Sequence, residues 1–239
     1  MAPLVLSARM KGILRRVPGL VTTYRHAQHL SAIAYERWWA DLQRLSDRSI
    51  LEGEWNFEAP PEQERYRRVL AAVATQRGTS SWGDALEIGC AEGLFTRELL
   101  RRCATVAAYD VSHVACERTA RTLPELRVER RNIERDPVSG LFDLVFMMGV
   151  LGYVHGRGRI GEVTAKVADA LRPGGLLVFN ELRIDDSRFE NCWWARAFAE
   201  GGLQLLKFLD GRDGLRLIHR EIHRKYVIGI YEKTARNLI

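Results

Sequence analysis

Residues 84–93 read Asp-Ala-Leu-Glu-Ile-Gly-Cys-Ala-Glu-Gly, and this stretch decides the fold. An apolar strand pattern runs into a turn of small residues, whose backbone a ligand can approach closely. A helix-like segment, Leu94–Arg102, follows, and a second apolar run, Val106–Tyr109, ends on Asp110, 17 residues after the last glycine. In a strand–helix–strand unit, an acid at about 20 positions beyond the glycine turn accepts the hydroxyls of a ribose. The sequence therefore predicts a nucleoside ligand.

The loop itself, Glu87-x-Gly89-x-Ala91-x-Gly93, separates two kinds of nucleoside. It lacks the middle glycine of a dinucleotide loop and holds no lysine or arginine that would meet a diphosphate. Glu87 precedes the first glycine by two residues and would repel a diphosphate. The loop suits a nucleoside with a cationic tail that carries no phosphate, and a dinucleotide or other Rossmann ligand is the alternative.

With this loop the sequence resembles the class I S-adenosylmethionine (SAM)-dependent methyltransferases, whose first motif is E/D-x-G-x-G/A-x-G. A closer resemblance, over roughly residues 50–180, is to the nodulation N-methyltransferase (NodS-like) family. The segments that carry it are Glu54-Trp55-Asn56-Phe57, Pro61, Arg65-Tyr66, LEIGCAEG (86–93), FDLVF (142–146), GVLGYV (149–154) and LRPGGLLVF (171–179). Those enzymes methylate the free amine of a glucosamine end on a chitin-like oligosaccharide. The resemblance implies SAM as cofactor and a small-molecule acceptor, a saccharide or an amine. Gly149 departs from the family, which commonly has an acid there.

Ligands of an open parallel sheet bind beyond the carboxyl ends of its strands, which selects the candidate cofactor-binding residues. They are Glu87, Gly89, Cys90, Ala91, Gly93, Asp110, Val111, Asn132, Ile133 and Met147. The resemblance implies that Asp110 holds the ribose, that Val111 packs on adenine and that Asn132 meets the adenine amino group. The family usually has Asp in place of Asn132, whose amide oxygen still accepts. The backbone of Met147 would accept from the methionine amine, and plain core packing is the alternative there.

Methyl transfer from a sulfonium is an in-line displacement, and alignment of the two reactants contributes about 7–11 kcal/mol. An amine needs little further help, whereas a sugar hydroxyl needs a general base. The catalytic candidates are Tyr153, His155 and Glu181. Tyr153 would position the acceptor, His155 would be the base, and Glu181 with Arg183 would grip a polar acceptor. The alternatives are core packing for Tyr153 and an exposed loop position for His155.

Strand and helix patterns alternate after residue 84, which predicts an α/β fold with a doubly wound, mostly parallel, Rossmann-like sheet. Strands are expected near Ala85–Ile88, Val106–Tyr109, Leu126–Arg130, Phe142–Met147 and Leu176–Asn180, and helices near Leu94–Arg102, His113–Thr122, Arg159–Leu171 and Arg188–Leu209. Leu215–Ile222 and Tyr226–Tyr231 are expected to form an antiparallel pair of strands. The resemblance implies seven strands, with one antiparallel strand at the C-terminal end.

Residues 1–80 are expected to form an N-terminal helical extension and lid, and residues 81–239 the SAM-binding domain. A helix is predicted over Tyr24–Leu45, and a second begins at Pro60-Pro61. Trp55 and Phe57 lie just before the second helix, where a closing lid would exclude water. Anchoring of the N-terminal helices is the alternative role for these aromatic residues.

The net charge of +6 is unevenly spread along the 239 residues. Residues 1–35 hold five basic residues and no acid, which leaves only +1 for the rest, so nucleic acid is not an expected partner. This leader has three interpretations: a helix that packs on its own domain or on a homodimer mate, a surface helix that contacts a membrane or an acidic partner, or a targeting presequence. The four cysteines show no paired spacing, so neither a disulfide nor a metal is expected, and the setting would be cytoplasmic.

Two rival functions stay open on the sequence alone. A catalytically silent SAM-binding partner or sensor subunit is favoured by Gly149 and by the lack of an obvious base. A nucleic-acid methyltransferase is opposed by the lack of an Asn/Asp-Pro-Pro-Tyr/Phe signature after the fourth predicted strand.

Overall fold

The computed structural model describes residues 43–44, 46–48, 50–51, 56–78, 80–184 and 201–234. Backbone contacts divide the chain into two units, residues 1–45 and 46–239, and the sheet with its helices belongs to the second unit. The leader of residues 1–35, nearly all of the predicted helix Tyr24–Leu45, and Trp55 lie outside the described residues. Residues 188–200 of the predicted helix Arg188–Leu209 also lie outside them. None of the helices within the described ranges has the length and hydropathy that a bilayer span requires.

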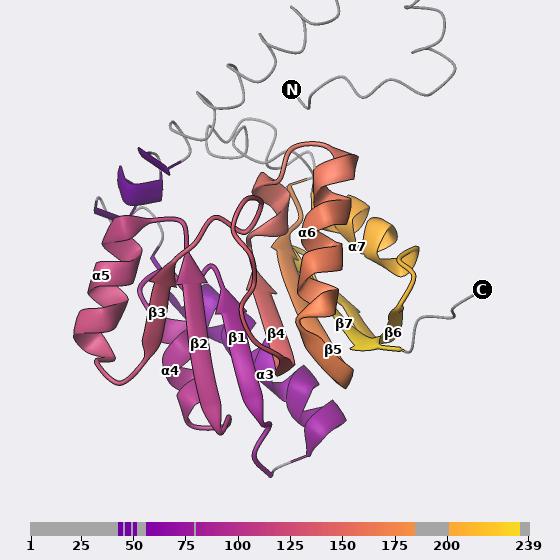
Figure 1. Ribbon diagram of the computed structural model, residues 1–239, viewed down its shortest axis with the longest axis horizontal. Coiled ribbons are helices and arrows are strands. Elements are labelled where there is room, and N and C mark those ends of the chain that lie inside the picture. Colours follow the sequence, from indigo (N-terminus) through magenta and orange to yellow (C-terminus); the bar gives the residue numbers. More distant parts are fainter. Residues whose placement is uncertain are drawn as a thin grey trace, which may run out of the picture. The chain divides into compact units, whose positions relative to one another are not determined.

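A seven-stranded sheet with the order β3-β2-β1-β4-β5-β7-β6 forms the centre of this unit (Figure 1). Its strands are β1 (Asp84–Ile88), β2 (Thr105–Asp110), β3 (Arg127–Arg130), β4 (Phe142–Met148), β5 (Leu171–Leu182), β6 (Leu215–Ile222) and β7 (Tyr226–Lys233). Strands β1 to β5 pair in parallel, and β7 runs antiparallel to both of its neighbours, β5 and β6. The predicted doubly wound, mostly parallel sheet with one antiparallel C-terminal strand is confirmed.

Helices cover both faces of the sheet (Figure 1). They are α3 (Pro60–Arg77), α4 (Leu94–Leu100), α5 (His113–Thr122), α6 (Arg157–Asp169) and α7 (Gly202–Asp210), with a short 3₁₀ helix, η1 (Leu151–Tyr153), after β4. The strand side chains alternate between two cores, as the period of a strand requires. In β4, Leu144 and Phe146 pack with α3 and α4, whereas Val145 and Met147 pack with α6 and α7.

Helix α3 forms where the sequence predicts it. A proline in the first helical turn lacks only an N–H that would have no partner within the helix, and Gly78, with φ +76°, ends the helix. The predicted apolar stripe, which includes Tyr66 and Val69, is buried. Arg65 is buried on the same side, which the apolar pattern alone did not predict.

The start of β5 corrects one predicted boundary. Helix α6 ends at Asp169, and Leu171 pairs with Phe142 as the first residue of β5 instead of closing the helix. Leu171 is completely buried in the sheet, so tertiary packing outweighs its helical spacing. The register shifts between Phe142 and Leu144, because the Arg172–Gly175 stretch makes the strand irregular there.

Candidate cofactor and acceptor site

The turn after β1 has the tight backbone that a close ligand requires. Gly89, Ala91 and Gly93 all have a positive φ, at +84°, +47° and +77°. A Cβ atom on Gly89 would lie 2.4 Å from Cγ2 of Val150, so no side chain fits at that position. The left-handed conformation of Ala91 costs about 1–2 kcal/mol, which the surrounding contacts must offset. The turn thus has the left-handed backbone expected of a ligand-binding loop, and its role as the cofactor cradle stays a prediction.

Asp110 ends β2 beside this turn and is held by two backbone donors. The N–H of Ala91 donates to Oδ2 at 2.9 Å, and the N–H of Ser112 donates to Oδ1 at 2.8 Å. Burial raises the pKa of Asp110, while these N–H groups act in the opposite direction. Each carboxylate oxygen accepts more than one hydrogen bond, so Asp110 keeps capacity for a ribose diol. The residue lies where the sequence predicts the ribose contact.

Glu87 lies beneath the same turn and is only 1% exposed. Its Oε2 accepts a hydrogen bond from the hydroxyl of Thr96, at 2.5 Å. Burial, with a smaller contribution from the charge of Asp110, raises the pKa of Glu87 to about 8. Across the described ranges no lysine, arginine or histidine pairs with Glu87. A buried, acid-rich loop of this kind fits a cationic nucleoside and opposes a diphosphate.

A second acid, Glu181, lies at the carboxyl end of β5, 1% exposed. Its Oε2 accepts from the N–H of Gly152 in η1, at 2.9 Å, and Oε1 accepts from the N–H of Leu182. A Cβ on Gly149 would lie 3.9 Å from Oε1, at ordinary van der Waals distance, so Gly149 adjoins this carboxyl. Burial raises the pKa of Glu181 to about 7.

Tyr153 connects the two acidic positions. Burial raises the pKa of its phenol well above the usual range, and the charges of Glu181 and Asp110 raise it further. Tyr153 therefore lies within electrostatic range of both Glu181, the other catalytic candidate, and the ribose-binding candidate Asp110. His155 follows η1 by two residues and is half-buried, so it is not the fully exposed loop histidine of the alternative interpretation.

The other predicted cofactor-binding residues differ in their burial and in the hydrogen bonds that they already form. The Oδ1 of Asn132 accepts from the N–H of Glu134 at 3.0 Å, so this oxygen is engaged within its own turn. An amide oxygen has two lone pairs, so it keeps one acceptor position for the adenine amino group. The Met147 side chain is 1% exposed and packs in the core, which leaves only its backbone for a ligand. Ile133 and Cys90 are also buried, and Val111 directly follows Asp110 and is half-buried.

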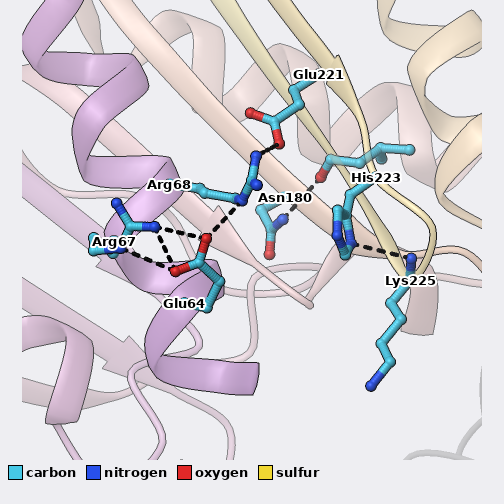
Figure 2. Close-up of polar contacts among 8 residues, drawn as sticks. Glu64, Arg67, Arg68, Asn180, Glu221, His223 and Lys225 are labelled. Carbon is cyan, nitrogen blue, oxygen red and sulfur yellow. Dashed lines mark hydrogen bonds and ion pairs between the residues drawn. The ribbon is translucent and has the colours of Figure 1, made fainter. Parts of the chain in front are cut away.

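Helix α3 is fastened to the C-terminal strands by polar side chains that the sequence patterns did not predict. The guanidinium of Arg65 donates to the side-chain oxygen of Asn180, which precedes Glu181. The side-chain nitrogen of Asn180 donates in turn to the carbonyl of Val227 at 2.8 Å, and Arg68 pairs with Glu221 of β6 at 2.7 Å (Figure 2). The helix and the mouth of the site are thus joined through β5.

One of these missed residues had a signal in the sequence. Arg65 precedes Val69 by four residues, so it lies on the buried stripe of α3. Thr96 and Asn180 carry no local signal, because their partners Glu87 and Arg65 come from other elements.

Comparisons with known proteins agree with this geometry. A methyltransferase-domain family model matches residues 86–177. Nodulation protein S of Sinorhizobium fredii is 30% identical over 179 residues, which cover 70% of this chain and 79% of that protein. Nodulation protein S of Rhizobium tropici is 30% identical over 150 residues, and this match spans 60% of each of the two chains.

A solved structure has the same fold. The N-methyltransferase NodS from Bradyrhizobium japonicum WM9, in complex with S-adenosylhomocysteine (SAH), superposes with a TM-score of 0.68. The two proteins are 22% identical, and the superposition covers 81% of this chain and 98% of the other. The matched domain, the relatives and the acid-rich loop all agree: the chain belongs to the nodulation protein S family and is a class I SAM-dependent methyltransferase.

Proposed function

We propose that this protein methylates a free amine on a small, sugar-like acceptor. The family resemblance and the names of the relatives support an amine, and the buried acids at the mouth of the site support it independently. A hydroxyl on a sugar-like or natural-product acceptor is the competing choice. When bound, SAM supplies an electrophilic methyl group on a positively charged sulphur.

The observation that carries the proposal is the carboxyl of Glu181, buried beside η1 and next to Gly149. An amine must present its lone pair, so an ammonium acceptor has to lose a proton first. A carboxyl group with a pKa of about 7 is near half ionisation at neutral pH, and it takes up and releases such a proton readily. A sugar hydroxyl is a far weaker acid and would need a stronger base. The site chemistry therefore favours an amine.

The remaining candidates have complementary roles in this proposal. Asp110 and the Gly89–Gly93 turn hold the cofactor, and the Tyr153 phenol orients the acceptor between Asp110 and Glu181. His155 is the second candidate for the proton acceptor. Alignment of the reactants contributes the larger part of the rate, about 7–11 kcal/mol.

The test uses the full chain, SAM, and a chitin-derived oligosaccharide with one terminal free amine. The matched control substrate is the same oligosaccharide with every amine acetylated. We expect mass spectrometry to detect the gain of one methyl group on the first substrate alone. Glu181→Gln should lower kcat about 100-fold and remove the rise of kcat through pH 7, because the proton acceptor is gone.

Two results would contradict the proposal. Equal methylation of the acetylated control would identify a hydroxyl acceptor. Binding of SAM without turnover of any amine or glycan would identify a silent partner subunit.

The N-terminal extension and lid over residues 1–80 stay a prediction. The same holds for contacts of residues 1–35 with a membrane, an acidic partner or a second copy of the chain. Trp55 and nearly all of residues 1–45 lie outside the described part of the structure.

A further inference from the structure

Glu87 is a buried acid that forms no ion pair with any of the residues the structure describes. It lies in β1 with 1% exposure and holds one hydrogen bond, from the hydroxyl of Thr96 in α4. A carboxylate in such a place is costly, because burial removes the water that would solvate its charge. In the ligand-free protein Glu87 therefore keeps its proton at neutral pH.

The titratable groups that face Glu87 come from three parts of the chain: α3, the turn after β1 and the end of β2. Tyr66 of α3 interacts with it electrostatically, as do Cys90 in the turn and Asp110 at the end of β2. All three become neutral or negative, never positive. Arg65 of α3 acts electrostatically on Tyr66, and its guanidinium is engaged with Glu62 and Asn180. A missing counter-charge is thus a property of the whole cluster.

A positively charged sulphur is present in only one of the two cofactor forms. SAM carries a sulfonium and SAH a neutral thioether, while both carry the same amino acid tail. We propose that Glu87 distinguishes SAM from SAH by releasing its proton when the positively charged sulphur binds. The O–H bond of the Glu87 carboxyl breaks, the proton passes to the solvent, and the carboxylate remains as the counter-charge. Departure of the thioether product reverses the step.

This inference goes beyond the choice of acceptor, because it concerns only the binding of the two cofactor forms. Proton release is visible in calorimetry, since the heat of binding then depends on the ionisation enthalpy of the buffer. We expect SAM to release close to one proton at pH 7 and SAH markedly less. A second readout is the ratio of two association constants for SAM, that of the wild type divided by that of Glu87→Gln. This ratio should rise about tenfold per pH unit until the pH approaches 8.

Amino-acid substitutions test whether the proton that is released on SAM binding comes from Glu87. Glu87→Gln keeps the size of the side chain and should abolish the difference in proton release between SAM and SAH. Glu98→Gln is the matched control, because this acid of α4 lies outside the turn and is paired with Arg102 at 2.8 Å. It should release as many protons as the wild type.

Thr96→Val is a second variant, which tests the role of Glu87 even if Glu87→Gln does not fold. It removes the hydrogen bond that stabilises the ionised form, so the midpoint of proton release should move to higher pH. Equal release with SAM and SAH, persistent release in Glu87→Gln, or an unmoved midpoint in Thr96→Val would each overturn the proposal. Because no acceptor is present, these outcomes are independent of whether the protein methylates an amine.

Discussion

At the scale of single residues, Asp110 is the most direct test of the cofactor site. Its carboxylate is aligned by the N–H groups of Ala91 and Ser112 and accepts a ribose diol in the proposed complex. Hydrogen bonds to a charged group contribute about 1.5–3 kcal/mol each, so Asp110→Ala should weaken SAH binding about 100-fold or more. Calorimetry with SAH measures this, and Asp213→Ala, which removes an exposed acid before β6, is the control. An unchanged affinity in a folded Asp110→Ala protein would rule out the ribose contact.

A second residue-scale prediction concerns stability and pH. The pKa of Glu87 rises from its usual 4.5 to about 8 on burial, so the folded state holds a proton that the unfolded state has lost. The free energy of unfolding should therefore fall as the pH rises from about 4.5 to about 8, at about 1.4 kcal/mol per pH unit for this group. Burial also raises the pKa of Glu181, to about 7, so this residue lowers the free energy of unfolding in the same way as the pH rises to about 7.

Urea unfolding of the ligand-free protein at three pH values between 5.5 and 7.5 checks this slope. In Glu87→Gln the slope should be shallower by about 1.4 kcal/mol per pH unit, because the titrating group is gone. Parallel slopes for the two proteins would show that Glu87 ionises normally in the fold.

At the scale of elements, the turn after β1 and the 3₁₀ helix η1 depend on each other through Gly89. Gly89 and Gly174 both have a left-handed φ, but a Cβ on Gly89 would meet Val150 at 2.4 Å, whereas nothing lies within 4 Å of Gly174. Gly174→Ala should cost only the backbone strain, about 1–2 kcal/mol. Gly89→Ala should cost about 1–3 kcal/mol more, and it alone should weaken SAH binding, because Val150 leads into η1. Equal losses would show that the two elements are independent.

The same elements show how far local patterns predict this molecule. Period-two and period-3.6 patterns suffice for β6, whose predicted bounds Leu215–Ile222 are those of the structure. They fail for η1, because three residues are too short to show a period. They also fail for the bond between Arg65 and Asn180, which joins residues 115 positions apart. The positions of the ligand-binding acids followed from the strand ends, but their burial and partners required the three-dimensional structure.

At the scale of the whole molecule, the amino ends of the strands are held by ion pairs, whereas the carboxyl ends carry the candidate site. At the amino ends of the strands, Arg172 pairs with Asp84 at 2.7 Å and with Asp143 at 2.8 Å, which ties β1, β4 and β5 together. At the carboxyl ends, the buried Arg65 holds Asn180 beside the site. The same substitution, arginine to methionine, at position 172 and at position 65 therefore compares the contributions of the two ends of the sheet.

Arg172→Met should lower the free energy of unfolding by at most about 1 kcal/mol, because its ion pairs are partly exposed, and should leave the affinity for SAH unchanged. Arg65→Met should cost about 1–3 kcal/mol, because the side chain of Asn180 loses its buried donor. It should also weaken SAH binding and raise the KM for the acceptor, since Asn180 adjoins Glu181 and its carbonyl accepts from the N–H of Gly149. Urea unfolding and calorimetry of the two variants separate these effects. Equal losses of SAH affinity in both variants would show that stability alone, and not the local link from α3 to β5, controls the site.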